Sequence, residues 1–115
     1  MSEARDGKNF AAWLTLHGFR FIHVPNEGKR SYAVAASLKA QGLQPGFPDY
    51  LIFDDPQIAW ELKSPGKEAT TAQRKWLGTL HLLGWKVGCG TIKEAQDFVE
   101  TFHEVPSRIR SVRKY

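Results

Sequence analysis

The chain has 115 residues, of which 42% are hydrophobic and 24% are charged, and it includes seven Phe and four Trp. A chain of this size and composition forms one globular domain with a single core, which excludes a disordered protein and a pair of independent domains. Sixteen Lys and Arg against twelve Asp and Glu leave a net charge of +4. This mild basic excess suits a polyanionic partner without establishing one.

The sequence gives no sign of export, of membrane insertion or of a metal site built from cysteine or histidine. Cys89 is the single cysteine, so an internal disulfide is excluded and a reducing, cytoplasmic location is expected. The four histidines fall in separate segments without the spacing of a zinc site. No signal-peptide pattern occurs, and no apolar run approaches the roughly 20 residues that span a bilayer.

Hydrophobic spacing, capping residues and turn residues predict the elements in chain order. Phe10, Trp13 and Leu14 share one face of a first helix, which Gly18 ends. The predicted elements are a helix at 3–17, a strand at 19–24, a short helix at 31–42, strands at 49–53 and 58–63, a helix at 70–84, a strand at 85–89 and a helix at 91–102.

The two C-terminal helices carry the clearest caps and apolar faces. Thr70 or Thr71 caps the first of them, and Thr91 and Glu94 have the spacing of a capping box at the start of the second. Their apolar faces follow from helical spacing. These faces are Ala72, Trp76, Leu77, Leu80 and Leu83 in the first helix, and Ala95, Phe98, Val99 and Phe102 in the second.

This order of elements predicts an α/β fold in which helices flank a small, mixed central sheet. The sequence contains no internal repeat and no low-complexity segment. We expect one domain at residues 1–105, followed by a basic C-terminal tail at 106–115.

Two carboxylates and a lysine stand out on the two strands in the middle of the chain. Side chains alternate along residues 58–63, so Glu61 and Lys63 share one face. If the reversal between the strands covers residues 54–56, Asp49 lies directly opposite Glu61, with Cβ atoms about 5 Å apart. A shift of the register by one residue would remove this arrangement.

Two adjacent carboxylates repel each other, so the predicted pair calls for a cation. Oxygen ligands suit Mg²⁺ or Mn²⁺, which bind one or two protein carboxylates together with waters and a substrate phosphate. In this interpretation Asp49 and Glu61 hold the ion, and Lys63 orients or deprotonates the attacking water. The alternative is that Asp49 only begins a strand and that Glu61 and Lys63 form an exposed pair on an edge strand.

The sequence resembles the PD-(D/E)xK nuclease superfamily, and more closely its VRR-NUC branch, the virus-type replication-repair nucleases. The resemblance covers most of the chain and implies a restriction-endonuclease-like core of helix, three strands, helix and strand. It also implies a stand-alone, phage-like enzyme of DNA repair. The residues that carry it are Gly46-Phe47-Pro48-Asp49, Glu61-Leu62-Lys63-Ser64, Gln73, Trp76 and Gly84-Trp85-Lys86-Val87.

The resemblance also assigns roles to individual residues. It implies that Asp49, Glu61 and the Leu62 carbonyl ligate the metal ion, and that Lys63 serves the nucleophilic water. Gln73 matches the family's glutamine and is expected to position Lys63 or a phosphate. A solvent-facing residue in the first turns of a helix is the alternative reading of Gln73.

An acidic residue on the first helix is a further expected ligand. Glu3 matches the acid that this family carries there, ahead of the Trp13-Leu14 pair. The helix dipole alone explains an acid in a first turn equally well. Glu27, in a loop that could reach the site, is a rival for the same role.

Basic residues cluster around these motifs and in the tail, where they could meet phosphates. A solvated surface explains each of them singly just as well. No base-reading motif occurs, so recognition of shape is expected. The predicted nucleic-acid contacts are Lys29, Arg30, Lys67, Arg74 and Lys75, and further candidates are Lys39, Arg108, Arg110, Arg113 and Lys114.

The sequence therefore predicts a Mg²⁺- or Mn²⁺-dependent endonuclease that acts on DNA. The resemblance implies branched substrates such as four-way junctions, and because resolving a junction takes two cuts, a homodimer follows as a corollary. One alternative is a non-catalytic module that binds nucleic acid. Another is a nuclease subunit that depends on a helicase or other partner. The intact Asp, Glu and Lys set favours the enzyme.

Overall fold

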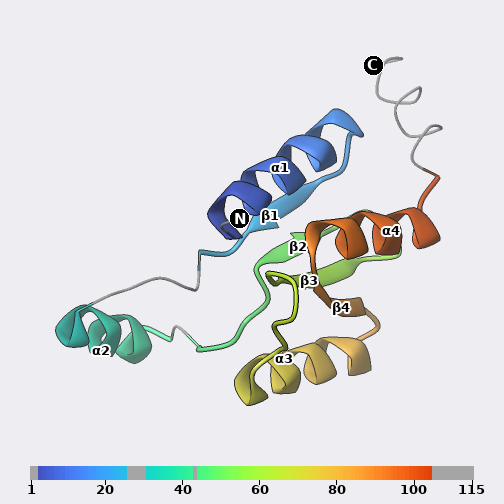
Figure 1. Cartoon of the computed structure of the whole chain (residues 1–115). Coiled ribbons are helices and arrows are strands. Elements are labelled where there is room, and N and C mark those ends of the chain that lie inside the picture. Colours follow the sequence, from blue (N-terminus) through green and yellow to red (C-terminus); the bar gives the residue numbers. More distant parts are fainter. Residues whose placement is uncertain (1–2, 26–30, 43, 105–115) are drawn as a thin grey trace.

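The computed structural model describes residues 3–25, 31–42 and 44–104. In these segments the helices and strands follow one another in the predicted order (Figure 1). The elements are α1 (Glu3–Leu16), β1 (Phe21–His23), α2 (Tyr32–Ala40), β2 (Tyr50–Ile52), β3 (Ile58–Leu62), α3 (Thr71–Leu82), β4 (Lys86–Gly90) and α4 (Ile92–Phe102).

A four-stranded sheet in the order β1-β2-β3-β4 forms the centre of the fold. β2 runs antiparallel to both β1 and β3, whereas β3 and β4 are parallel. A short reversal joins β2 to β3, while the parallel pair needs a crossover, which α3 provides. The predicted α/β fold with a mixed sheet is confirmed.

Helices cover both faces of this sheet. α1 and α4 pack on one face, where Phe10 and Val99 share a core cluster with Ile52 and Trp60. α3 packs on the other face through Leu80 (Figure 1). Every residue of β3 is buried, which explains why its sequence is almost continuously apolar.

Trp60 fastens β3 to β4. Its indole N–H donates a hydrogen bond to the Gly90 carbonyl oxygen at 3.3 Å. The ring lies so close to Gly88 that a Cβ atom at that position would overlap it. The glycines of β4 therefore leave room for the indole, in a register that places Glu61 beside Cys89.

Local capping signals set the starts of three helices. Thr70 caps α3 through a capping box with Gln73, and Thr91 caps α4 through a capping box with Glu94. Ser31 caps α2 by accepting a hydrogen bond from a backbone N–H. These side chains accept hydrogen bonds from backbone N–H groups that have no partner within the first turn of the helix. The capping residues in the sequence were therefore sufficient to predict where these helices start.

Most boundaries differ from the prediction by one or two residues, and two of these differences have a clear structural cause. Leu83, predicted on the apolar face of α3, is 71% exposed because the helix ends at Leu82 and the helical period no longer applies to its C-cap residue. β1 starts later than expected because the Phe19 N–H donates to the Leu14 carbonyl oxygen at the end of α1. Phe19 therefore belongs to the end of that helix and not to the strand.

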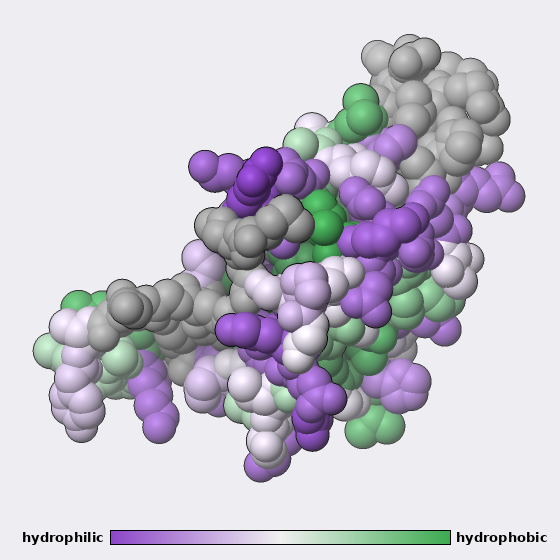
Figure 2. Space-filling view, viewed as in Figure 1, coloured by the Kyte–Doolittle hydropathy of each residue, from purple (hydrophilic) through white to green (hydrophobic). Residues whose placement is uncertain are grey.

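The predicted short helix at α2 forms, but it covers no core. None of its residues is buried, and Figure 1 shows it apart from the layers of the domain. Figure 2 shows hydrophobic surface on this part of the molecule. On α2, Val34 is half-exposed, and the ring-bearing Tyr32 is almost fully exposed. None of the described helices, α2 included, is long and apolar enough to cross a bilayer.

Candidate active site

The hairpin of β2 and β3 has the register that the sequence predicted. Tyr50 pairs with Trp60, and Ile52 pairs with Ile58. One step further along the same ladder, Asp49 comes opposite Glu61. The arrangement depends on this register because one residue of slip would send either carboxylate to the other face.

Asp49 is held in place from both sides. Its Oδ2 atom accepts a hydrogen bond from the Leu62 backbone N–H at 3.1 Å. Its own carbonyl oxygen accepts from the Val24 N–H, just beyond the end of β1, at 2.7 Å. The carboxylate is buried and therefore has a fixed position at the end of the sheet.

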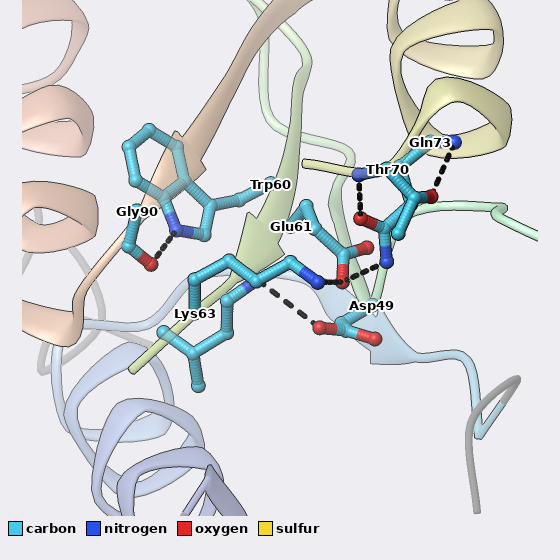
Figure 3. A network of polar contacts seen from close by, with 8 residues as sticks. Asp49, Trp60, Glu61, Lys63, Thr70, Gln73 and Gly90 are labelled. Carbon is cyan, nitrogen blue, oxygen red and sulfur yellow. Dashed lines mark hydrogen bonds and ion pairs between the residues drawn. The ribbon is translucent and has the colours of Figure 1, made fainter. Parts of the chain in front are cut away.

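Glu61 is fully buried and is the centre of the polar contacts (Figure 3). Its Oε2 atom accepts a hydrogen bond from the Gln73 side-chain amide at 2.9 Å. The Lys63 ammonium nitrogen lies 3.8 Å from the same oxygen. Lys63 is itself buried, so both charges of this pair are largely removed from water. An ion pair on a solvated edge strand, the alternative reading of these residues, does not describe this arrangement.

Gln73 ties the start of α3 to Glu61. Its side-chain oxygen accepts from the Thr70 backbone N–H at 2.8 Å, while its N–H₂ group donates to Glu61. The side chain is buried, which excludes the solvent-facing alternative. We predicted that Gln73 positions Lys63 or a phosphate. Its amide contacts Thr70 and Glu61, and Lys63 lies near the same Glu61 oxygen that accepts from Gln73.

A Gln73→Glu substitution tests this link. Glutamate keeps the capping box with Thr70 but replaces the donor facing Glu61 with a second carboxylate. We expect unfolding free energy to fall by about 3 kcal/mol at pH 7, and to recover partly at pH 5, where one carboxyl takes up a proton. Urea unfolding at both pH values measures this, with Gln57→Glu on the exposed hairpin as the control. Equal losses for the two variants would contradict the link.

Burial and the site charges shift two nearby pKa values. Burial raises the pKa of Tyr50 to about 12, and the negative charge of Asp49 adds to the shift. Burial also raises the pKa of the Cys89 thiol, followed by the charge of Glu61, while Lys63 acts in the opposite direction. The Cys89 thiol therefore stays protonated at neutral pH, beside Glu61 in the parallel register.

The Tyr50 pKa makes stability depend on alkaline pH. The folded chain favours the neutral phenol, so this contribution is complete below pH 10 and is lost as the pH rises to about 12. It amounts to roughly 2 to 3 kcal/mol. We expect the difference in unfolding free energy between the wild type and Tyr50→Phe to shift in favour of the variant between pH 9 and about pH 12. A constant difference, measured by urea unfolding, would contradict the cited pKa.

Two carboxylates fit a hard divalent cation. Figure 3 shows Asp49 and Glu61 side by side, both facing the same space at the end of β3. Mg²⁺ and Mn²⁺ prefer such oxygen donors, and Mg²⁺ commonly keeps several waters with only one or two carboxylates. In the described segments no group of three or more His, Cys, Asp and Glu residues could hold a metal ion. Asp49 and Glu61 together therefore suit a cation that completes its coordination with water.

The fold was compared with known proteins. No family model and no curated protein matches the sequence. A solved structure described as "VRR_NUC domain protein" matches with a TM-score of 0.74 at 19% sequence identity, covering 91% of this chain and 90% of that one. The chain has the VRR_NUC fold. Because nearly the whole of both chains is covered, the resemblance that the motifs indicated extends to the complete topology.

In this VRR_NUC fold the first helix carries a buried acid, Asp6, that the sequence analysis did not single out. Glu3 begins α1, but its side chain and the whole of Glu27 lie outside the residues that the structure describes. Asp6, on the same helix, is buried. It precedes Phe10 and Leu14 by one and two helical repeats, so that spacing could have indicated an inward-facing acid.

The predicted basic contacts divide into two groups. Lys67, Arg74 and Lys75 are exposed on the loop after β3 and on the first turns of α3, near the end of the VRR_NUC sheet that carries the carboxylates. Arg74 lies 3.9 Å from the Glu68 carboxylate, and both side chains are solvated. Lys39 is exposed on α2. The other candidates, Lys29, Arg30, Arg108, Arg110, Arg113 and Lys114, lie outside the described segments.

Proposed function

We propose that the chain is a divalent-metal-dependent endonuclease that hydrolyses DNA phosphodiester bonds. The observation that carries the proposal is the buried trio of Asp49, Glu61 and Lys63, with the lysine 3.8 Å from the Glu61 carboxylate. Burying two acids and a lysine at the end of a sheet carries a desolvation cost that can exceed the attraction between them. A buried, convergent set of ionisable groups of this kind is therefore a candidate functional site.

The chemistry follows from what each residue can hold. Asp49 and Glu61 would hold Mg²⁺ or Mn²⁺, with the Leu62 carbonyl as an expected further ligand, and the ion would stabilise charge on the phosphate. The described contact of Leu62 is made by its N–H, which fixes the Asp49 carboxylate. Lys63 would hold the attacking water and offset phosphate charge, while Gln73 keeps the Glu61 carboxylate oriented.

The depth of the site supports selectivity for DNA structure. Glu61 is fully buried, and Asp49 and Lys63 are less than a tenth exposed. The backbone of a regular duplex is stiff, so a strand that departs from the double helix reaches recessed groups at lower cost. Branched DNA such as a four-way junction offers such strands. Paired cuts at a junction would require a homodimer with two sites.

A substrate panel tests the proposal. Labelled four-way junction, flap and duplex DNA are incubated with the protein in Mg²⁺, Mn²⁺ or EDTA, and products are resolved on denaturing gels. We expect cleavage only with metal and faster cleavage of the branched substrates. Cleavage that persists in EDTA would overturn the metal dependence. Binding that weakens with salt, is indifferent to metal and leads to no cleavage would instead identify a non-catalytic module.

A further inference from the structure

An aromatic pair joins the segment ahead of Asp49 to α3. Phe47 lies two residues before Asp49, and its ring meets Trp76 of α3 edge-on, with centroids 5.0 Å apart and an angle of 76° between the planes. Both side chains are partly buried, and Phe47 packs against the core cluster that contains Leu51 and Leu80. The pair therefore belongs to the face of the sheet that α3 covers.

The backbone of the same segment also approaches α3 closely. A Cβ atom at Gly46 would lie 2.7 Å from the Ala72 carbonyl carbon and 2.8 Å from the Gln73 nitrogen. Trp76 follows one helical turn later, where it meets the Phe47 ring. The segment thus contacts two successive turns of α3, by its backbone at the first turn and by a side chain at the second. Contacts at two heights hold the segment against sliding along the helix.

α3 consequently bears on both carboxylates of the candidate site. The Gln73 side chain donates a hydrogen bond to Glu61 at 2.9 Å, and Asp49 lies beside Glu61 (Figure 3). The Asp49 carboxylate accepts a hydrogen bond from the Leu62 N–H, which ties it to the sheet. The aromatic contact ties the segment of Asp49 to the same helix that orients Glu61. The separation of the two carboxylates therefore depends on one helix.

We propose that Trp76 is a positioning residue that acts through Phe47 to hold the Asp49 carboxylate at a fixed separation from Glu61. This inference rests on the proposed nuclease function and assigns to the contact a part in the choice of cation. Mg²⁺ demands near-ideal octahedral geometry, whereas Ca²⁺ accepts more oxygen ligands in flexible arrangements. Fixed carboxylates therefore favour Mg²⁺. A loosened Asp49 segment should weaken the binding of Mg²⁺ more than the binding of Ca²⁺.

A second aromatic pair on the same face of the sheet provides a matched control. Phe53 meets Trp85 edge-on at the same angle of 76°, with ring centroids 5.9 Å apart, and Trp85 packs against the same core cluster. This pair lies at the other end of β2, where the chain reverses toward β3. Replacing either tryptophan by leucine removes one partly buried indole from this face, so the losses of stability should be similar. Cation binding should change only in Trp76→Leu.

Cation binding is measured without DNA. Mg²⁺ and Ca²⁺ are each titrated into the wild type, Trp76→Leu, Trp76→Phe, Phe47→Leu and Trp85→Leu, and amide NMR shifts report the affinity. We expect Trp76→Leu to weaken Mg²⁺ binding about tenfold, the lower end of the range for residues that orient metal ligands, and to weaken Ca²⁺ binding less. Trp76→Phe keeps a ring against Phe47 and should restore most of the affinity. Phe47→Leu should match Trp76→Leu, and the double variant should lose no more, because the two side chains form one contact.

Amide exchange in metal-free protein tests the positioning separately from the function. Because the Leu62 N–H donates to the Asp49 carboxylate, it should exchange faster in Trp76→Leu than in Trp85→Leu. Equal exchange in the two variants, or equal Mg²⁺ affinity, would overturn the positioning role even in a chain that cleaves DNA. Faster exchange in a chain that binds no divalent cation and cleaves no DNA would overturn the proposed function and leave the hold on Asp49 standing.

Thermal melting shows which variants are folded. If Trp76→Leu does not fold, Phe47→Leu carries the same comparison with Trp85→Leu, because it removes the other ring of the contact. Wild-type Mg²⁺ affinity and wild-type Leu62 exchange in folded Phe47→Leu would likewise overturn the proposal.

Discussion

Lys63→Ala and Asp49→Asn are each expected to lower metal-dependent cleavage by about 10²- to 10⁴-fold, the range for loss of one positioned catalytic group. Lys63 is the cation beside the buried Glu61, and its removal takes away both the group that we propose serves the attacking water and the charge that offsets the carboxylate. Asp49→Asn keeps the shape of the side chain but replaces one of the two carboxylates proposed to bind the metal with a neutral amide. Initial rates on junction DNA in Mg²⁺ measure both effects.

Matched controls lie at the other end of the sheet. Lys86 begins β4 and is exposed, with its ammonium 5.4 Å from the centre of the Phe102 ring. Asp55 is exposed in the β2-β3 reversal. We expect Lys86→Ala and Asp55→Asn to cleave at the wild-type rate. Full activity of Asp49→Asn or Lys63→Ala, in protein with a native urea transition, would remove the basis of the proposed function.

Gly46→Ala is expected to destabilise the chain by about 2 to 5 kcal/mol. Gly46 has a φ of +86°, and a Cβ atom there would lie 2.7 Å from the Ala72 carbonyl carbon and 2.8 Å from the Gln73 nitrogen. Both neighbours are backbone atoms at the start of α3, so they cannot turn aside. The clash would separate the segment that carries Asp49 from the helix that carries Gln73, and cleavage should fall together with stability.

Gly66→Ala isolates the contribution of the clash. Gly66 has a similar φ of +82°, but nothing lies within 4 Å of the Cβ position. The Gly66→Ala variant should therefore lose only the unfolding free energy that a left-handed backbone costs a non-glycine residue, about 1 to 2 kcal/mol. Urea unfolding of both variants gives the difference. If Gly46→Ala were no less stable than Gly66→Ala, the close approach of this loop to α3 would be excluded.

In the hairpin of β2 and β3, residue spacing alone predicted the register and the faces of the strands. Alternation along β3 and the length of the reversal were enough to place Asp49 opposite Glu61 and Lys63 beside Glu61. These relations are local, because the turn fixes the register and the pleat fixes the face. The caps at Thr70 and Thr91 were readable for the same reason, since their partners lie three residues away.

Contacts between elements that are distant in the chain could not be predicted from the sequence. The parallel register that puts Cys89 beside Glu61 depends on how α3 returns the chain to the sheet, and no turn fixes it. The hydrogen bond from Gln73 to Glu61 depends on the height of α3 above the sheet. The stacking of His23 on Tyr50 depends on the pairing of β1 with β2 across an inserted helix.

By itself the sequence determined the order of the elements, the faces of the central hairpin and the identity of the two carboxylates and the lysine. All of these follow from spacing within a few residues, where backbone geometry leaves little choice. Only the tertiary structure decided that the trio is buried, that Gln73 holds Glu61, and that Asp6 on α1 is buried. Burial and contact between elements depend on packing of the whole core, in which distant segments must fit together at once.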